Sequence, residues 1–322
     1  MKKSLFMLGL AVAAMTSCSN DELMEFNENN FITFESHVNK GTRAVTPTAG
    51  LTRFYVFGYH NGSTGNPVFN NVNVDGTMGG SWTYDDADND LVAWTANTYK
   101  FAAYANKNSS DKLSSVTFAD GKLTIPSFTA SDATDLVAAV SGNITPNVSG
   151  SNAAVDLTFK HMLSKVYFVL TNNSPEGYKM QVSNITFDVL PSGNCVYDGT
   201  NAVWTPSGTA TELEFTEGSN TDIALNDART TEEHLVIPNQ SLKDIRASFT
   251  VSFYDADDNK VDEKAYNNVT IKLDSAGDNT WQPGYVYKYT ASISSDTEYI
   301  VFDVAPIDGW KDATPNPVGG LN

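Results

Sequence analysis

Cysteine and basic side chains are both scarce in this chain. Its 322 residues include only two cysteines, Cys18 and Cys195, so modification of Cys18 would leave no disulfide within the chain. Stability must then come from packing, and a chain of this length can bury a large core. Lysine and arginine number 20 against 38 aspartates and glutamates, which gives a net charge of −18 at pH 7. This scarcity of basic residues excludes nucleic acid as a partner, because binding it depends on clustered lysine and arginine.

Motifs for catalysis and for metal binding are also missing. No two histidines have the spacing of a zinc site, and no Gly-x-Ser-x-Gly, phosphate loop or Cys/His pair occurs. His161, which lies beside an alternating segment, is interpreted as a structural histidine. The acidic runs 86–90 and 255–259 resemble calcium loops, but both lack the glycine at the sixth position and the glutamate at the twelfth, so we predict turns. We therefore expect no enzyme, no cofactor and no metal site.

Long apolar runs are limited to the N-terminus. The run 5–15 has 11 residues, fewer than the ~20 that a membrane-spanning helix needs. Two lysines precede it and small residues lead from it to Cys18, so we predict a secretory signal peptide over 1–17. A cleavage site directly before a cysteine resembles that of bacterial lipoproteins, which implies that Cys18 is acylated and anchors the protein in outer-membrane lipid. Asp21 and Glu22 resemble the surface-export signal of Bacteroidales lipoproteins, with an ordinary solvated linker as the alternative.

Helical periodicity is missing, whereas threonine, serine, asparagine and valine are abundant. Alternating apolar and polar segments recur along the chain, bounded by glycine, asparagine, aspartate or proline, which is the pattern of sandwich sheets joined by turns. We interpret 81–90 as a loop whose Trp82 and Tyr84 pack against a sheet. Strands are predicted at 31–38, 53–60, 98–105, 123–126, 136–140, 154–160, 165–172, 181–190, 212–217, 234–238, 245–254, 268–273, 286–294 and 299–304. That number of strands fills two β-sandwiches.

One stretch marks a division of the chain. The segment 141–152 is rich in turn residues and poor in bulky ones, so we place a domain boundary near residue 150. The last residues, 311–322, contain two prolines and two glycines, and no regular strand tolerates prolines spaced so closely. We expect a flexible tail there.

Seven short phrases are spread from the leader to the C-terminus: GTRA at 41–44, FAAYAN at 101–106, DLVAA at 135–139, FKHMLSKV at 159–166, LVIP at 235–238, WQPGYVY at 281–287 and PIDGW at 306–310. Together they resemble the fimbrillin family of Bacteroidales, in particular the Mfa-like fimbrillins that build type V pili. The resemblance implies an all-β fold with two tandem transthyretin-like (Greek-key) β-sandwich domains. We place the propeptide at 18–43, the N-terminal domain at 44–150 and the C-terminal domain at 151–310.

The resemblance also implies a route of maturation. In such pilins an N-terminal strand completes the first sheet until a trypsin-like protease cuts after an arginine, and a strand from a neighbouring subunit then fills the empty groove. Here Ile32, Phe34 and Val38 alternate with more polar residues, and the predicted cut lies between Arg43 and Ala44, with other basic residues nearby as competitors. Loss of this strand would expose ladder groups and an apolar face. Addition of a partner's strand would restore both.

The donor end of the chain leaves two interpretations open. Ile300, Phe302 and Val304 alternate, and they form either the last strand of their own domain or part of a segment donated to the next subunit. The tail 311–322 is a poor donor strand by itself. A tip or accessory subunit, which accepts a strand without offering one, therefore fits as well as a stalk subunit.

We therefore predict a structural subunit of a type V pilus, whether stalk, tip or accessory, at the outer membrane and cell surface. It would be exported as a lipoprotein, cut after Arg43 and assembled by donor-strand exchange for adhesion. Its partners would be other pilin subunits, the maturation protease, membrane lipid through Cys18, and a receptor on a host or bacterial surface. The alternative is a non-polymerising surface lipoprotein that binds a glycan or a host ligand. Its candidate sugar platforms would be Trp82, Trp94, Trp204, Trp281 and Trp310, although buried sandwich tryptophans are the other interpretation.

Overall fold

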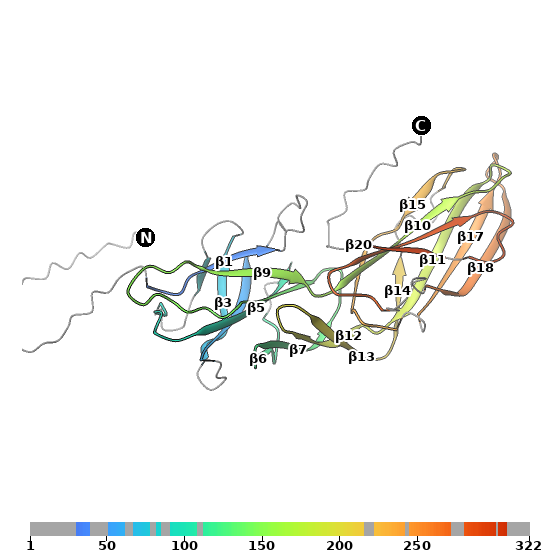
Figure 1. Ribbon diagram of the computed structural model, residues 1–322. Coiled ribbons are helices and arrows are strands. Elements are labelled where there is room, and N and C mark those ends of the chain that lie inside the picture. The colour runs from blue at the N-terminus through green and yellow to red at the C-terminus, as the bar shows by residue number, and fades with distance from the viewer. Residues whose placement is uncertain are drawn as a thin grey trace, which may run out of the picture.

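The chain is built from β-strands. A computed structural model describes residues 30–38, 51–61, 67–77, 82–84, 91–107, 112–215, 222–241, 245–271, 280–300 and 302–307, and these ranges contain twenty strands and no α-helix. Within the same ranges there is accordingly no helix able to cross a membrane. The elongated arrangement places the N-terminal strands at one end and the C-terminal strands at the other (Figure 1). The all-β class expected from the sequence is confirmed.

The N-terminal end is organised around a seven-stranded sheet. Only the first pair is parallel, that of β1 with β9. In spatial order its strands are β1 (Phe34–Val38), β9 (Val155–His161), β8 (Asp135–Val140), β5 (Tyr99–Lys107), β2 (Arg53–His60), β3 (Pro67–Gly76) and β4 (Trp82–Tyr84).

A four-stranded sheet, called here the composite sheet, joins distant parts of the chain. Its spatial order is β13 (Ala202–Ser207), β12 (Ser192–Tyr197), β7 (Lys122–Thr129) and β6 (Thr117–Ala119). The central pair of β7 with β12 links residues on either side of position 150. Strand β9 also follows position 150 in the sequence, yet it pairs with β8 in the seven-stranded sheet. The boundary expected near residue 150 therefore does not coincide with a division between sheets, and a two-domain division stays a prediction.

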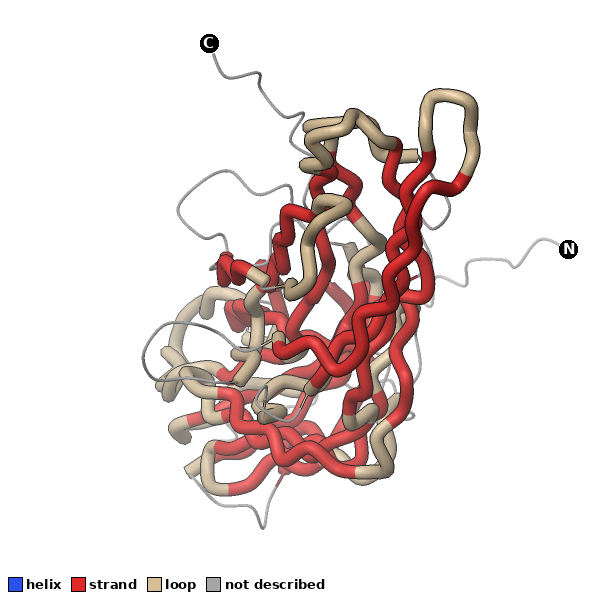
Figure 2. The backbone as a smooth tube through the Cα atoms, turned by 90° about the vertical axis from the view of Figure 1, so that its right-hand side faces the viewer, coloured by secondary structure: helices blue, strands red, loops and turns tan. Residues whose placement is uncertain are grey.

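The C-terminal end is a sandwich of two sheets. The five-stranded sheet contains β15 (Ala228–Thr230), β10 (Ser164–Asn172), β19 (Val286–Ile293) and β20 (Asp303–Ile307) in spatial order, with β16 (His234–Val236) also paired to β10. The second, called here the outer sheet, contains β14 (Thr211–Phe215), β11 (Lys179–Val189), β17 (Arg246–Tyr254) and β18 (Lys260–Thr270). Figure 2 shows the strands in red, running through the molecule with loops at their ends.

Three apolar cores hold these sheets together. The first core lies on one face of the seven-stranded sheet, the second lies between the opposite face and the composite sheet, and the third fills the C-terminal sandwich. Strand β2 serves two of them, because Phe54 and Val56 enter the first core while Tyr55 and Phe57 enter the second. A strand buried on both faces reads as a continuous apolar run rather than an alternating one.

The junction between the two ends carries an ion pair. His234 Nδ1 lies 2.6 Å from Asp132 Oδ2, and the backbone N–H of Leu235 donates to the other carboxylate oxygen at 2.8 Å. Burial by itself would lower the pKa of His234, but the hydrogen bond and charge of Asp132, together with Glu232, outweigh burial and raise that pKa. Burial would likewise raise the pKa of Asp132, but the bonds from His234 and Leu235 outweigh it and lower that pKa.

We expect Asp132→Ala to lower the free energy of unfolding in a pH-dependent way. Because the pKa of His234 is raised, its ion pair stabilises the fold fully below the ordinary histidine pKa of about 6.5, and this stabilisation is lost as the pH rises through the folded pKa. Because the pKa of Asp132 is lowered, its contribution to stability is present above the ordinary aspartate pKa of about 3.9. Half of the Asp132 side chain is exposed, so solvent screens the pair and we expect an effect of about 1 kcal/mol near pH 5. Urea unfolding at pH 5 and pH 8 measures it, with the exposed Asp257→Ala as control. An effect that is equal at both pH values would contradict the prediction.

Most of the expected strands are present, and the differences from the predictions are confined to particular strands. The predicted strand 53–60 matches β2 residue for residue, and 286–294 matches β19 within one residue. The predictions at 268–273 and 299–304 are misplaced, because β18 ends at Thr270 and β20 begins only at Asp303. The stretch 81–90 was expected to be a loop, but Trp82–Tyr84 forms β4 with Trp82 buried, as its packing role predicted. Strands β3, β6, β12, β13 and β15 have no counterpart among the predictions.

Candidate functional site

The candidate site is the edge of the seven-stranded sheet that β1 occupies. The five residues of β1 pair in parallel with β9, from Phe34 opposite Val155 to Val38 opposite Phe159. Just before β1, the backbone N–H of Val155 donates to the carbonyl of Thr33 at 2.7 Å. Because β1 is the last strand in the sheet order, its other edge has no strand partner among the described residues. Strand β1 is thus joined to the sheet through one ladder.

The side chains of this segment alternate as the sequence predicts. Ile32 is 0% exposed, Phe34 4% and Ser36 2%, whereas Thr33 and Glu35 are exposed. The side chain of Val38 lies outside the described residues, although its backbone belongs to β1. The segment therefore inserts one apolar face into the first core and leaves the other in solvent.

Phe34 is the central anchor of the segment. Its ring lies in a box of four aromatic side chains, with centroid distances of 5.4–6.0 Å and edge-to-face geometry throughout. This aromatic box consists of Phe54, Phe69, Tyr84 and Phe101. Because Tyr84 belongs to β4, the far edge of the same sheet, the sheet curls until its two edges approach each other around Phe34.

The residues just before β1 are held differently. The backbone N–H of Ile32 donates to the carbonyl of Val92 at 2.8 Å, and the N–H of Trp94 donates to the carbonyl of Asn30 at 2.9 Å. Phe31 forms an antiparallel bridge with Ala93 between these two bonds. The start of the segment is therefore paired with residues 92–94, whereas β1 is paired with β9.

The C-terminal candidates lie in the third core. Phe302 is 5% exposed and contacts Phe168, Phe249 and Tyr289 at centroid distances of 5.2, 5.9 and 6.3 Å. Ile300 packs against the same core, and Val304 pairs through its backbone with Tyr289 in the ladder of β20 with β19. In this structure Ile300 and Phe302 precede β20, the strand at the edge of their sheet to which Val304 belongs, and donation of the segment remains a prediction.

Several predicted positions lie outside the described residues, namely Cys18, Arg43, Ala44, Trp310 and the acidic run 86–90. The acidic run 255–259 forms the predicted turn, in which Asp255 Oδ1 accepts the backbone N–H groups of Asp257 and Asn259 at 2.9 Å each. His161 is a structural histidine, with Nδ1 at 2.9 Å from Asp135 Oδ2 and both side chains less than 10% exposed.

The tryptophans bear on the glycan-binding alternative. Four of the five lie among the described residues, and all four are at most 6% exposed: Trp82, Trp94, Trp204 and Trp281. The indole N–H of Trp204 donates to the carbonyl of Met162 at 2.7 Å, and that of Trp281 donates to the Tyr289 hydroxyl at 2.9 Å. They are core residues, so none of the four offers a platform for a sugar ring.

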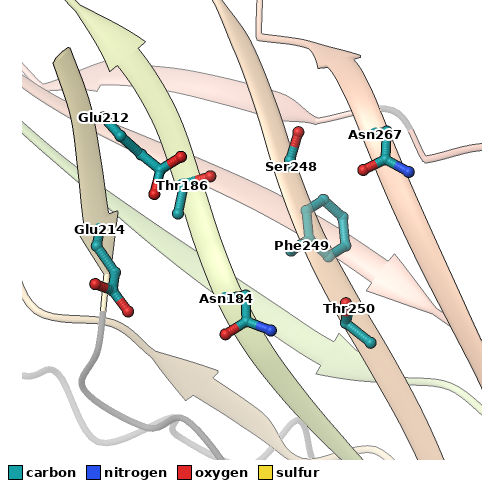
Figure 3. A pocket seen from close by; sticks show the side chains of 8 residues that line it. All are labelled: Asn184, Thr186, Glu212, Glu214, Ser248, Phe249, Thr250 and Asn267. Atoms are coloured by element: carbon teal, nitrogen blue, oxygen red, sulfur yellow. The ribbon is translucent and has the colours of Figure 1, made fainter.

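A second feature is a polar hollow of about 310 Å³ on the outer sheet (Figure 3). Its side chains come from all four strands of that sheet, and Figure 3 shows two carboxylates along β14, Glu212 and Glu214. The ring of Phe249 is buried in the third core, so the hollow has no exposed aromatic platform. Within the described ranges, no three histidine, cysteine or acidic residues are grouped to hold a metal ion.

Comparison of the sequence with known protein families finds one match. The sequence model of a family described as fimbrillin-like matches residues 42–310. A fimbrial protein from Bacteroides vulgatus has a similar structure, with a TM-score of 0.60 and 17% identity over 88% of this chain and 100% of that one. A proposed cell adhesion protein from Bacteroides ovatus has a TM-score of 0.52 and 14% identity, over 88% of this chain and 98% of that one. At these identities the structures support the fold alone, and no curated protein matches the sequence.

Proposed function

Since this chain belongs to the fimbrillin-like family, we propose that it is a structural subunit of a type V pilus in which β1 occupies the place of a partner's strand until it is cut away. The subunit is exported as a lipoprotein, held at the outer membrane through acylated Cys18, and released by a trypsin-like protease that cuts between Arg43 and Ala44. Other pilin subunits are then its partners, and it acts in adhesion as part of the fimbrium at the cell surface.

The burial of Phe34 on an edge strand is the observation that carries this proposal. The aromatic box closes around a side chain that belongs to the segment before the predicted cut, so departure of the segment empties the box. An empty apolar groove and an unpaired edge of β9 both favour strand addition. The family match begins at residue 42, beside Arg43 and after β1, which supports a mature subunit without this strand.

The C-terminal segment supplies a matching strand. Residues 31–36 read FITFES and residues 299–304 read YIVFDV, so both have an aromatic residue, isoleucine, a β-branched residue, phenylalanine, an acidic residue and a smaller side chain in the same order. The acidic positions, Glu35 and Asp303, are exposed in both segments. Tyr299 is 85% exposed in its present place. We propose that Ile300, Phe302 and Val304 of one subunit replace Ile32, Phe34 and Ser36 of the next.

The burial lost and the burial regained in such an exchange are comparable. Donation removes one buried large side chain, Phe302, and the partly buried Ile300 from the third core, and core truncations of phenylalanine cost about 3–5 kcal/mol. Refilling the groove places Ile300 and Phe302 of the donor where the two anchors Ile32 and Phe34 were buried, and the combined truncation of two such anchors would cost about 5–10 kcal/mol. The burial regained in the groove is thus of the same order as the burial lost from the third core, and partial burial of Tyr299 adds to the gain.

Cleavage in solution tests the proposal. Treatment of the chain with a trypsin-like protease is expected to give a new N-terminus at Ala44, read by N-terminal sequencing, and a ladder of oligomers on electrophoresis. The variant Arg43→Gln, which removes the cut site and nothing in the described fold, should stay uncut and monomeric. Unchanged mass and monomeric behaviour of the treated natural chain would refute the proposal.

A further inference from the structure

The hydroxyl of Tyr84 fills a gap in a short backbone ladder. In a regular antiparallel pair, Ile32 and Val92 would exchange two direct N–H to carbonyl hydrogen bonds. One is present, from Ile32 N–H to Val92 carbonyl at 2.8 Å. In place of the other, Val92 N–H donates to the Tyr84 hydroxyl at 2.9 Å, and that hydroxyl donates to the carbonyl of Ile32 at 3.1 Å. The Tyr84 side chain thus completes the pair from β4.

The ring of Tyr84 binds the same segment a second time. It packs edge-on against Phe34, with centroids 6.0 Å apart, and against Phe69 of β3 at 5.0 Å. Tyr84 therefore contacts the backbone at Ile32 and the central anchor of β1 together, and it does so from the opposite edge of the seven-stranded sheet. No other residue of the aromatic box forms a hydrogen bond to the backbone of this segment in the described part of the chain.

The segment is consequently held by different partners along its length. In the described part of the chain, the backbone of residues 34–38 is paired with β9, whereas Asn30–Ile32 is paired with 92–94 and bridged by Tyr84. The end of the segment at Val38 is the one nearer the predicted cut at Arg43. After a cut, fraying begins at the newly freed end of the strand, which is at Val38.

We propose that Tyr84 is a latch, a positioning residue that retains the start of the segment after cleavage and so sets the order of strand exchange. This inference rests on the proposed function. The cut strand detaches from Val38 towards Phe34 and leaves Ile32 last, so an incoming strand pairs first beside Phe159 of β9 and advances towards Val155. The part of the groove around Phe34 and Val38 empties first, and the old strand stays latched at Ile32 while the new one enters.

Tyr84→Phe separates the latch from the packing of the ring. The full chain is labelled on the N-terminal side of residue 30, cut with a trypsin-like protease, and followed by fluorescence as the cut segment dissociates. Loss of one bridging hydroxyl is expected to make dissociation about threefold to tenfold faster. Amide exchange at Val92 should also accelerate, while the rate of cutting at Arg43 stays unchanged. Tyr254→Phe, at a half-buried tyrosine of β17 in the outer sheet, is the matched control and should behave like the natural chain.

The outcomes distinguish the latch from the function on which it rests. If Tyr84→Phe releases its segment at the natural rate while both proteins form oligomers, the latch is wrong and the pilus proposal stands. If cutting releases no segment and yields no oligomers in either protein, both fail. Hydrogen exchange on the cut protein gives an independent check, because residues 34–38 must exchange faster than residues 30–33. Equal exchange across the segment would overturn the proposed order.

Discussion

Replacing Phe34 with alanine is expected to destabilise the seven-stranded sheet by about 3–5 kcal/mol, the usual cost of removing a buried phenylalanine from a packed core. Its ring is 4% exposed and surrounded by four aromatic rings from β2, β3, β4 and β5. Neighbouring strands cannot close such a cavity without leaving their ladders. Since whole domains are stable by about 5–15 kcal/mol, this one change removes a large share of the stability.

Hydrogen exchange resolves where the loss falls. Amides of β9 and β2 should exchange faster in Phe34→Ala, while those of β19, in the third core, should keep their natural rates. After cleavage at Arg43, the cut segment that carries Phe34→Ala should also dissociate roughly a hundredfold to several thousandfold faster than the natural segment, because 3–5 kcal/mol corresponds to that range. Glu35→Ala, on the exposed face of the same strand, should change stability by less than about 0.5 kcal/mol. An effect of Phe34→Ala no larger than that of Glu35→Ala would show that the aromatic box does not anchor the strand.

The sequence carries the first strand clearly because its signals are local. Ile32, Phe34 and Ser36 alternate with polar or charged residues, and one face of the strand is buried, so period two and burial agree. Strand β2 was also predictable, since an unbroken apolar run bounded by polar residues fits a strand buried on both faces. In both cases the residues that determine the structure lie within the strand itself.

Other strands lack such a signal. Strand β3 contains Asn70, Asn71 and Asn73, which favour turns, and Asn71 adopts a positive φ of 58° where the ladder shifts register. Strand β12 begins with serine, glycine and asparagine, and its pairing with β7 joins residues more than sixty positions apart. Only the three-dimensional fold supplies these strands with partners, so their composition does not reveal them.

Tyr84 shows the same limit at the candidate site. The sequence predicted that this residue packs against a sheet, but its contact with Ile32 spans 52 positions and depends on the curl of seven strands. The likeness of residues 31–36 and 299–304 was, by contrast, present in the sequence from the start. The structure gives this likeness its meaning, because Phe34 lies on an edge strand and Phe302 directly precedes one, each with its ring in a core.

A chain that begins at Ala44 should show the largest effect of all. It lacks both anchors, Ile32 and Phe34, whose combined truncation would cost about 5–10 kcal/mol, comparable with the stability of a whole domain. We therefore expect its seven-stranded sheet to be unfolded or to be completed by another copy, so that size-exclusion chromatography finds oligomers and no stable monomer. If the chain that begins at Ala44 is monomeric and as stable as the full-length chain, the segment is dispensable and strand exchange loses its basis.

Peptides added to the Ala44 chain test which strand the groove accepts. A peptide of residues 30–38 should restore the monomer, and at a hundred times its dissociation constant it should add about 2.7 kcal/mol by mass action. The peptide of residues 298–306, which aligns with it position by position, should bind in its place if Phe302 can enter the aromatic box. The same peptide with Phe302→Ala should lose most of that binding, because the box selects a large aromatic side chain at this position. Equal binding of both C-terminal peptides would mean that the groove does not select for Phe302. The alignment of residues 298–306 with 30–38 would then not determine which donor residue enters the aromatic box.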